Sequence, residues 1–184
     1  SGLSAIFFIL FASILEPSKF GELSFLIAIA QTTSIISRLG FNHTVTIFQG
    51  KEDKKTSQQI NNFVILSTSI CSIFLLFINP FVALLTLSMS FFVMSQHNIL
   101  GKSNYKFFMN ISILQGLFHL LFVIIMYVLF NLEGILIGMC ISNLICSFPF
   151  LKSFSKFNFN FVKLRKIWKI SIHNFGVDAS TNLS

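Results

Sequence analysis

The stretch "TSQQINNFVILSTSICSIFLLFINPFVALLTLSMSFFVMSQHNILG", residues 56–101, contains no Asp, Glu, Lys or Arg. A single helix of this length would be about twice as long as the roughly 30 Å hydrocarbon core of a bilayer is thick. The pair Asn79-Pro80 near its middle is typical of a turn. The stretch therefore predicts two membrane-crossing helices joined by a tight turn.

The composition of the whole chain supports this prediction. Of the 184 residues, 54% are hydrophobic and only 10% are charged, whereas roughly a quarter of the residues in a soluble domain are charged. We therefore expect an all-α integral membrane protein.

Apolar runs and the breakers between them predict six helices. They are expected at residues 3–15, 23–49, 60–78, 81–100, 107–130 and 135–151. The first run is short for a span, so we expect it to be truncated and the chain to be a fragment. Residues 1–151 would form a six-helix N-terminal lobe. Residues 152–184 would form a basic cytoplasmic linker and the start of a second lobe.

The distribution of Lys and Arg predicts the orientation. The first, third and fifth predicted connections contain only Lys19, while the second, fourth and sixth contain Lys51, Lys54, Lys55, Lys102, Lys106, Lys152, Lys156, Lys163, Arg165, Lys166 and Lys169. Positively charged connections stay on the cytoplasmic side, so we expect a multi-pass protein of the cytoplasmic membrane with a cytoplasmic N-terminus. The net charge of +7 then favours membrane lipids as partners and not nucleic acid.

The motifs of several enzyme classes are absent from the sequence. It contains no phosphate-binding loop, nucleophile elbow or zinc-protease motif, and the predicted helices contain no carboxylate for acid–base chemistry or cation coupling. Cys71, Cys140 and Cys146 lack metal-ligand spacing and are expected to be small core residues. We expect neither enzymatic activity, nor a cofactor, nor a metal.

Arg38 is the one permanent charge inside a predicted helix. Depth alone leaves two interpretations open. In one, the side chain snorkels to the inner headgroups, which it would reach because about 24 Å of helix separates Arg38 from Glu22; in the other, it lines a cavity inside the protein. At 100° per residue, however, one face of the predicted helix carries Arg38 together with Gln31, Ser34, Asn42, Thr46 and Gln49. A polar face of this kind favours a cavity-lining cation that binds phosphate or carboxylate.

Other polar groups in the predicted helices are weaker candidates. Ser112, Gln115 and His119 follow the spacing i, i+3, i+7, and most such groups bond their own or a neighbouring helix. His43 lies about 140° from Arg38 and is expected to pack, while His97 is expected at the membrane interface. Gly134 and Gly138 predict close helix packing. The predicted substrate-binding residues are Arg38, Gln31, Ser34, Asn42, Gln115 and His119.

Three stretches resemble a known family. They are "EPSKFGELSFLIAIAQTTSIISRLGFNHTVTIFQGKEDKK" (16–55), "LFNLEGILIGMCISNL" (129–144) and "KLRKIWKISIHNFG" (163–176). In loop length and polar second helix they are similar to polysaccharide biosynthesis flippases, the exporters of O-antigen and teichoic acid. The third stretch resembles the entry to that family's seventh helix.

The resemblance implies a MATE-like fold, the architecture of multidrug and oligosaccharidyl-lipid exporters, in which two six-helix lobes surround a central cavity. The partner of this lobe would be the missing second lobe. The implied substrate is a polyprenyl-pyrophosphate-linked oligosaccharide, flipped from the cytoplasmic to the outer leaflet by alternating access. Arg38 matches a basic position that engages pyrophosphate in related lipid II flippases. A drug or metabolite exporter, a membrane glycosyl- or acyltransferase, and a glycan-assembly protein without transport activity stay open as alternatives.

Overall fold

The computed structural model describes residues 9–151, 167, 168 and 170–176, and the regular structure in them is helical. The helices are α2 (Pro17–Arg38), α3 (Phe41–Gly50), α4 (Lys54–Leu76), α5 (Pro80–Gly101), α6 (Tyr105–Cys146) and α7 (Phe148–Leu151). Residues 9–14 and 170–176 are also helical. Residues 3–8 of the predicted first helix and most of the predicted basic linker lie outside the described residues.

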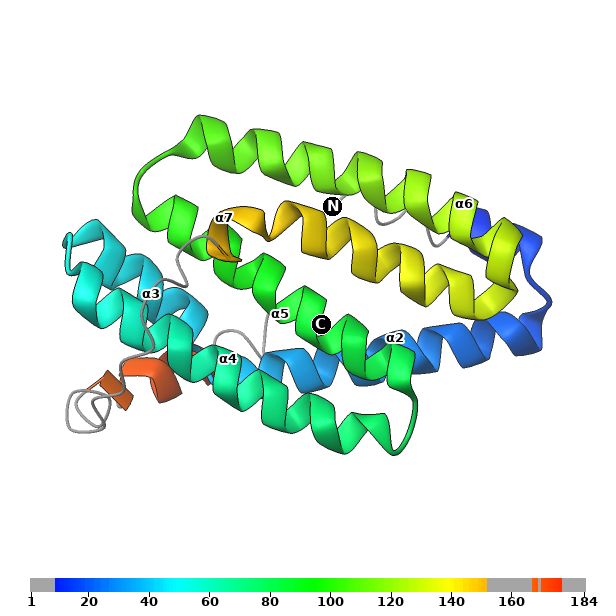
Figure 1. Ribbon diagram of the computed structural model, residues 1–184, viewed down its shortest axis with the longest axis horizontal. Coiled ribbons are helices and arrows are strands. Elements are labelled where there is room, and N and C mark those ends of the chain that lie inside the picture. The colour runs from blue at the N-terminus through cyan, green and yellow to red at the C-terminus, as the bar shows by residue number, and fades with distance from the viewer. Residues whose placement is uncertain (1–8, 152–166, 169, 177–184) are drawn as a thin grey trace.

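Helix α5 is the centre of the bundle. It contacts α2, α3, α4, α6 and α7, and Figure 1 shows it running between α4 on one side and the two arms of α6 on the other. The bundle is therefore organised around the second half of the charge-free stretch from which the fold was predicted.

The helices begin at the turn residues expected from the sequence. The Asn79 side chain accepts hydrogen bonds from the backbone N–H groups of Phe81 and Val82, at 2.8 and 3.3 Å, and Pro80 takes the first helical position. Asp53 caps α4 in the same way by accepting from the Thr56 N–H at 3.0 Å. These side chains satisfy N–H groups that a helix leaves unpaired at its start, which confirms the turn at Asn79-Pro80.

In the part of the chain that the structure describes, four helices, α2, α4, α5 and α6, are long and apolar enough to cross a membrane. Helix α6 has 42 residues and reverses direction at Asn131, whose backbone is non-helical (φ 53°, ψ −133°). Figure 1 shows its two arms side by side. They correspond to the predicted helices 107–130 and 135–151, although the reversal needs one residue where a four-residue loop was expected.

The close packing predicted from Gly134 and Gly138 is confirmed between the arms of α6. A Cβ atom at Gly138 would lie 2.6 Å from the Val123 Cα, and one at Gly134 would overlap the backbone carbonyl of Met126. Only glycine allows the two backbones to approach this closely.

The predicted continuous helix 23–49 is wrong. Leu39 (φ 51°) and Gly40 (φ 73°) have left-handed backbone conformations, and they separate α2 from α3. A Cβ atom at Gly40 would overlap the backbone of Ser171 and Phe175. The break therefore occurs where the helix at 170–176 packs against the chain.

The described residues of the bundle form two apolar cores. The first joins α2, the start of α5 and α6, and it includes Leu23, Ile27, Val82, Leu85 and Ile135. The second joins α3, the start of α4 and the end of α5, and it includes Phe41, Val45, Ile60, Val64 and Met94. Along α5, a run of buried polar side chains separates the two cores.

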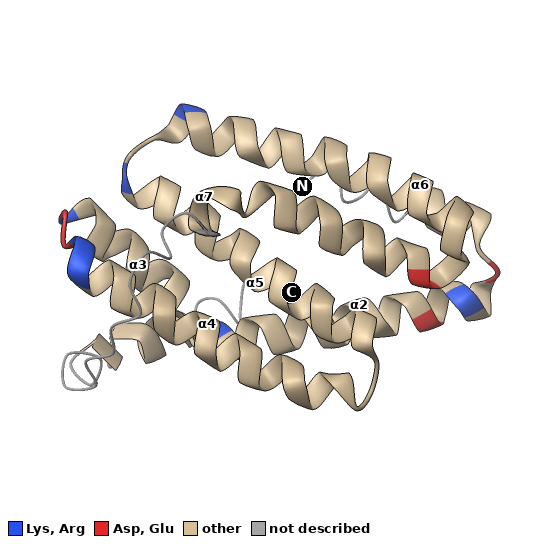
Figure 2. Cartoon of the chain, in the orientation of Figure 1, with Lys and Arg blue, Asp and Glu red and all other residues tan. Residues whose placement is uncertain are grey.

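The charged residues are segregated between the two ends of the bundle, as Figure 2 shows. Lys51 and Lys54 lie at the α3–α4 connection and Lys102 at the α5–α6 connection. Glu16 and Glu22 lie near the start of α2, at the opposite end. The chain is thus a multi-pass membrane protein whose lysine-containing α3–α4 and α5–α6 connections lie at one end, and Arg38 lies between the charged ends.

Candidate functional site

A buried cluster of hydroxyl groups surrounds Arg38. The Arg38 side chain is 4% exposed, and its Nη1 donates a hydrogen bond to the Ser34 Oγ at 2.5 Å. The Ser34 Oγ lies 2.9 Å from the Ser90 Oγ of α5. The guanidinium therefore extends into the bundle at the middle of α5, which argues against the snorkelling interpretation.

Ser37 connects the same cluster to α4. The Thr68 Oγ1 donates to the Ser37 Oγ at 3.2 Å, and the Ser67 Oγ donates to the Ser37 carbonyl at 2.7 Å. We call Ser34, Ser37, Arg38, Ser67, Thr68 and Ser90 the arginine cluster. It holds three helices together with hydroxyl groups that each donate one hydrogen bond and accept others.

A second polar cluster lies between α3, α4 and α5. Asn98 exchanges two hydrogen bonds with Asn61, at 3.0 and 3.1 Å, donates to the Met94 carbonyl at 2.7 Å and accepts from the Gln49 amide at 2.9 Å. His97 lies beside it. Its Nδ1 is 3.0 Å from the Thr46 Oγ1, and its Nε2 is 3.4 Å from the Asn42 Nδ2.

We call this second set of side chains the histidine–asparagine cluster. Its members are Asn42, Thr46, Gln49, Asn61, His97 and Asn98. The ring of His43 packs edge-on against the ring of His97, with centroids 4.9 Å apart. Packing was expected for His43, and this contact confirms it. The ring of His97 is bonded to α3 near the end of α5, and its expected position at the membrane interface stays a prediction.

The single polar face predicted for residues 31–49 is divided between different surroundings. Ser34 lies beside Arg38, as predicted, but Gln31 is exposed. Asn42 is buried at 1% exposure and bonds to His97. The break at Leu39 and Gly40 separates Asn42 from this face, since the wheel of 100° per residue assumed an uninterrupted helix. Gln31 lies before the break, and its exposure shows that a helical wheel does not predict which positions a neighbouring helix covers.

Gln115 and His119 form contacts between the two arms of α6. The Gln115 amide donates to the Asn143 Oδ1 at 3.0 Å, and the His119 Nδ1 lies 3.5 Å from the Ser142 Oγ. These contacts place neither residue in the arginine cluster. Of the six predicted substrate-binding residues, the observed contacts join only Ser34 to Arg38.

Sequence reasoning missed the contribution of α5 to both clusters. Thr86, Ser90 and His97 follow the spacing i, i+4, i+11 and so share one face of a helix. That spacing predicts, from the sequence alone, a polar face on α5, and this face packs against α2 and α3.

The cysteines lie in or at the edge of the apolar interior of the bundle. Cys140 and Cys146 are buried free thiols and Cys71 is half-buried, in agreement with their predicted role as core residues. In the described part of the chain, no three His, Cys, Asp or Glu side chains are grouped so that they could hold a metal ion.

The fold and the two buried clusters define a multi-pass helical membrane protein with a cation enclosed in its bundle. A family model described as "Polysaccharide biosynthesis protein" matches residues 1–127. The chain therefore belongs to the polysaccharide biosynthesis protein family, which confirms the resemblance seen in the sequence. Membership indicates a role in the transport or assembly of polysaccharide. Searches of curated proteins and of solved structures gave no match.

Proposed function

We propose that the chain is the N-terminal lobe of a flippase for a lipid-linked oligosaccharide. The observation that carries the proposal is Arg38, a cation that is 4% exposed and bonded to Ser34 inside the bundle. Burying a charge is costly, so an ionisable residue inside a membrane protein is by default a functional candidate.

The chemistry of the arginine cluster suits a pyrophosphate. A guanidinium presents a planar fork of donors that matches phosphate oxygens, and the hydroxyl groups of Ser34 and Ser90 add further donors beside it. Arg38 is covered in this structure, so a substrate would reach it only after the surrounding helices separate. Alternating access provides such a movement, with this structure as a closed state of the lobe.

The remaining parts of the proposal concern the whole protein. A second six-helix lobe would close the cavity from the opposite side, in a MATE-like arrangement within the cytoplasmic membrane. The N-terminus and the lysine-rich connections would face the cytoplasm, and no reaction would be catalysed. Gln31, Asn42, Gln115 and His119 stay candidate substrate contacts.

The test is substitution of Arg38 in cells whose surface polysaccharide depends on this protein. We expect Arg38→Met, which keeps most of the side-chain volume, to reduce surface polysaccharide about tenfold or more, because a charge-assisted hydrogen bond contributes about 1.5–3 kcal/mol. The Arg38→Lys variant should retain more surface polysaccharide than the Arg38→Met variant. Thr32→Ala is the matched control, since Thr32 is an exposed polar residue of α2 outside both clusters.

Two outcomes would contradict the proposal. Normal surface polysaccharide in Arg38→Met at matched protein levels would show that the buried cation does not act on the substrate. Loss of resistance to toxic compounds, with polysaccharide unchanged, would favour the drug or metabolite exporter. Accumulation of the lipid-linked precursor on the cytoplasmic leaflet of the Arg38→Met strain is the result expected of a flippase and separates it from an assembly protein without transport activity.

A further inference from the structure

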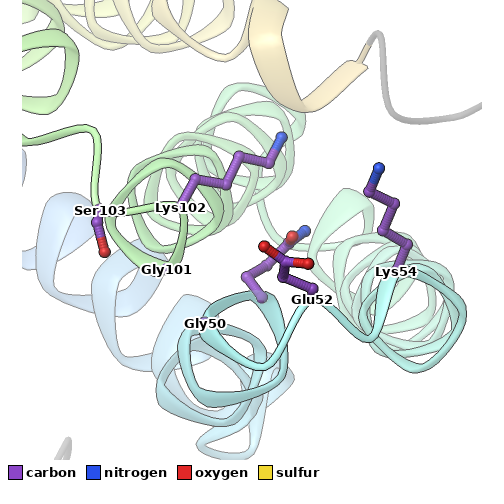
Figure 3. Close-up of a pocket in the computed structure, with 7 residues that line it drawn as sticks. Gly50, Glu52, Lys54, Gly101, Lys102 and Ser103 are labelled. Carbon is purple, nitrogen blue, oxygen red and sulfur yellow. The ribbon is translucent and has the colours of Figure 1, made fainter.

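A pocket lies at the lysine-rich end of the bundle, between the α3–α4 and α5–α6 connections (Figure 3). Its volume is about 460 Å³, within the range of about 300–1,000 Å³ typical of small-ligand sites. It is lined by Gln49, Gly50, Glu52, Lys54, Gly101, Lys102 and Ser103. It is separate from both polar clusters except for Gln49, which belongs to the histidine–asparagine cluster.

The walls of the pocket are held in place by close packing and by strained turns. A Cβ atom at Gly101 would lie 2.6 Å from the Gln49 Cβ and 2.7 Å from the Thr46 carbonyl oxygen, so the end of α5 is pressed against α3. Glu52 (φ 58°) and Ser103 (φ 56°) have left-handed backbone conformations, which are uncommon for residues other than glycine. Strain of this kind concentrates at ligand-binding and switch sites.

The charges of the pocket favour an anion that also carries a hydrogen-bond donor. Lys54 and Lys102 arise from different helices, and Figure 3 shows both side chains extending to the same side of the pocket. Glu52 adds one carboxylate near them, and Ser103 adds a hydroxyl group. Lys51 is not part of the lining, because its Nζ lies over the Phe48 ring, 5.9 Å from the centroid.

We propose that this pocket binds the phosphate-bearing headgroup of an anionic bilayer phospholipid such as phosphatidylglycerol. The lysines would hold the phosphate, and Glu52 would accept a hydrogen bond from a headgroup hydroxyl. The pocket lies at the charged end of the membrane helices, where headgroups are found, and basic pockets between such helices bind anionic headgroups. The bound lipid would join the two connections, a role beyond substrate flipping.

Native mass spectrometry of the purified protein, titrated with phosphatidylglycerol or phosphatidylcholine, measures the binding. The double variant Lys54→Gln/Lys102→Gln should weaken phosphatidylglycerol binding about 25-fold, since each lysine near a membrane surface contributes about fivefold. Lys51→Gln/Lys55→Gln is the matched control, because it removes the same charge from the same end but outside the pocket, and less than a twofold change is expected. Glu52→Gln should reduce the preference for phosphatidylglycerol over a lipid with the same charge and no headgroup hydroxyl.

The proposal is overturned if both double variants weaken binding equally, because the effect would then come from net charge and not from the pocket. Displacement of phosphatidylglycerol by inorganic pyrophosphate at an equal concentration would also overturn it, since the site would then recognise free phosphate. All the substituted lysines are exposed, so the variants are expected to fold. Their thermal unfolding in detergent checks this.

Discussion

The α4–α5 pair and the first arm of α6 are all membrane helices, but they differ in how much of their surface other helices cover. Half of the most apolar part of α4 and half of that of α5 are buried, whereas the first arm of α6 buries only Ile111, Gly116 and Val123. The buried residues of α4 and α5 include Asn61, Thr68, Ser90 and Asn98, and the first arm of α6 exposes leucines and isoleucines along its length. The polar groups of α4 and α5 are therefore concentrated where helices cover one another, and the first arm of α6 presents its surface to lipid.

Among the substitutions that test this difference, replacing Asn98 should lower the free energy of unfolding most. Asn98→Ala removes the hydrogen bonds to Asn61, Gln49 and the Met94 carbonyl. At about 0.6 kcal/mol for each hydrogen bond in a membrane protein, we expect a loss of about 2–3 kcal/mol in the free energy of unfolding. The free thiols provide the measurement, because Cys140 and Cys146 are buried and react with a thiol-specific dye only after unfolding. A loss below 1 kcal/mol would show that the histidine–asparagine cluster is not a main source of stability.

Substitution of Gly134 tests the close packing of the two arms of α6. Gly134→Ala would place a methyl group against the Met126 backbone, which cannot move aside, and overpacking of this kind costs about 1–3 kcal/mol. We expect a loss of about 2 kcal/mol in the same unfolding assay. Gly21→Ala is the control, because nothing lies within 4 Å of a Cβ atom there and alanine favours a helix. Equal stability of the two variants would contradict the tight contact between the arms.

Substitution of Gln115 should lower the free energy of unfolding least. Gln115→Ala removes one hydrogen bond, to Asn143, from a half-buried position, and about 0.6 kcal/mol is expected. Compared in the same assay, Gln115→Ala and Asn98→Ala measure directly how the two regions differ. If Gln115→Ala is as destabilising as Asn98→Ala, polar contacts stabilise α6 as much as they stabilise α4 and α5.

The sequence predicted those parts of the fold that depend on local chemistry. Asn79-Pro80 marks a turn because the asparagine caps a helix and the proline begins it, and both effects act within four residues. The packing at Gly134 and Gly138 was predicted for a similar reason, since the absence of a Cβ atom is a local property. The start of α4 after Asp53 is a further case.

The parts that were missed depend on partners distant in sequence. Gly40 is required by the backbone of Ser171 and Phe175, which a helical wheel does not include, so the break between α2 and α3 was not placed. The exposure of Gln31 and the hydrogen bonds of the His97 ring likewise depend on which neighbouring helices cover them. Ser34 was assigned correctly because it lies one turn from Arg38 on the same unbroken helix.

The reversal at Asn131 also bears on how the protein is made. The two arms of α6 are joined without a connection of any length, so the second arm leaves the ribosome directly after the first. The one residue between the arms keeps their facing ends together, so the contact at Gly134 and Gly138 joins segments that are already neighbours. We expect α6 to enter the membrane as a preassembled pair of helices, with the contact at Gly134 and Gly138 formed before the rest of the bundle closes around it.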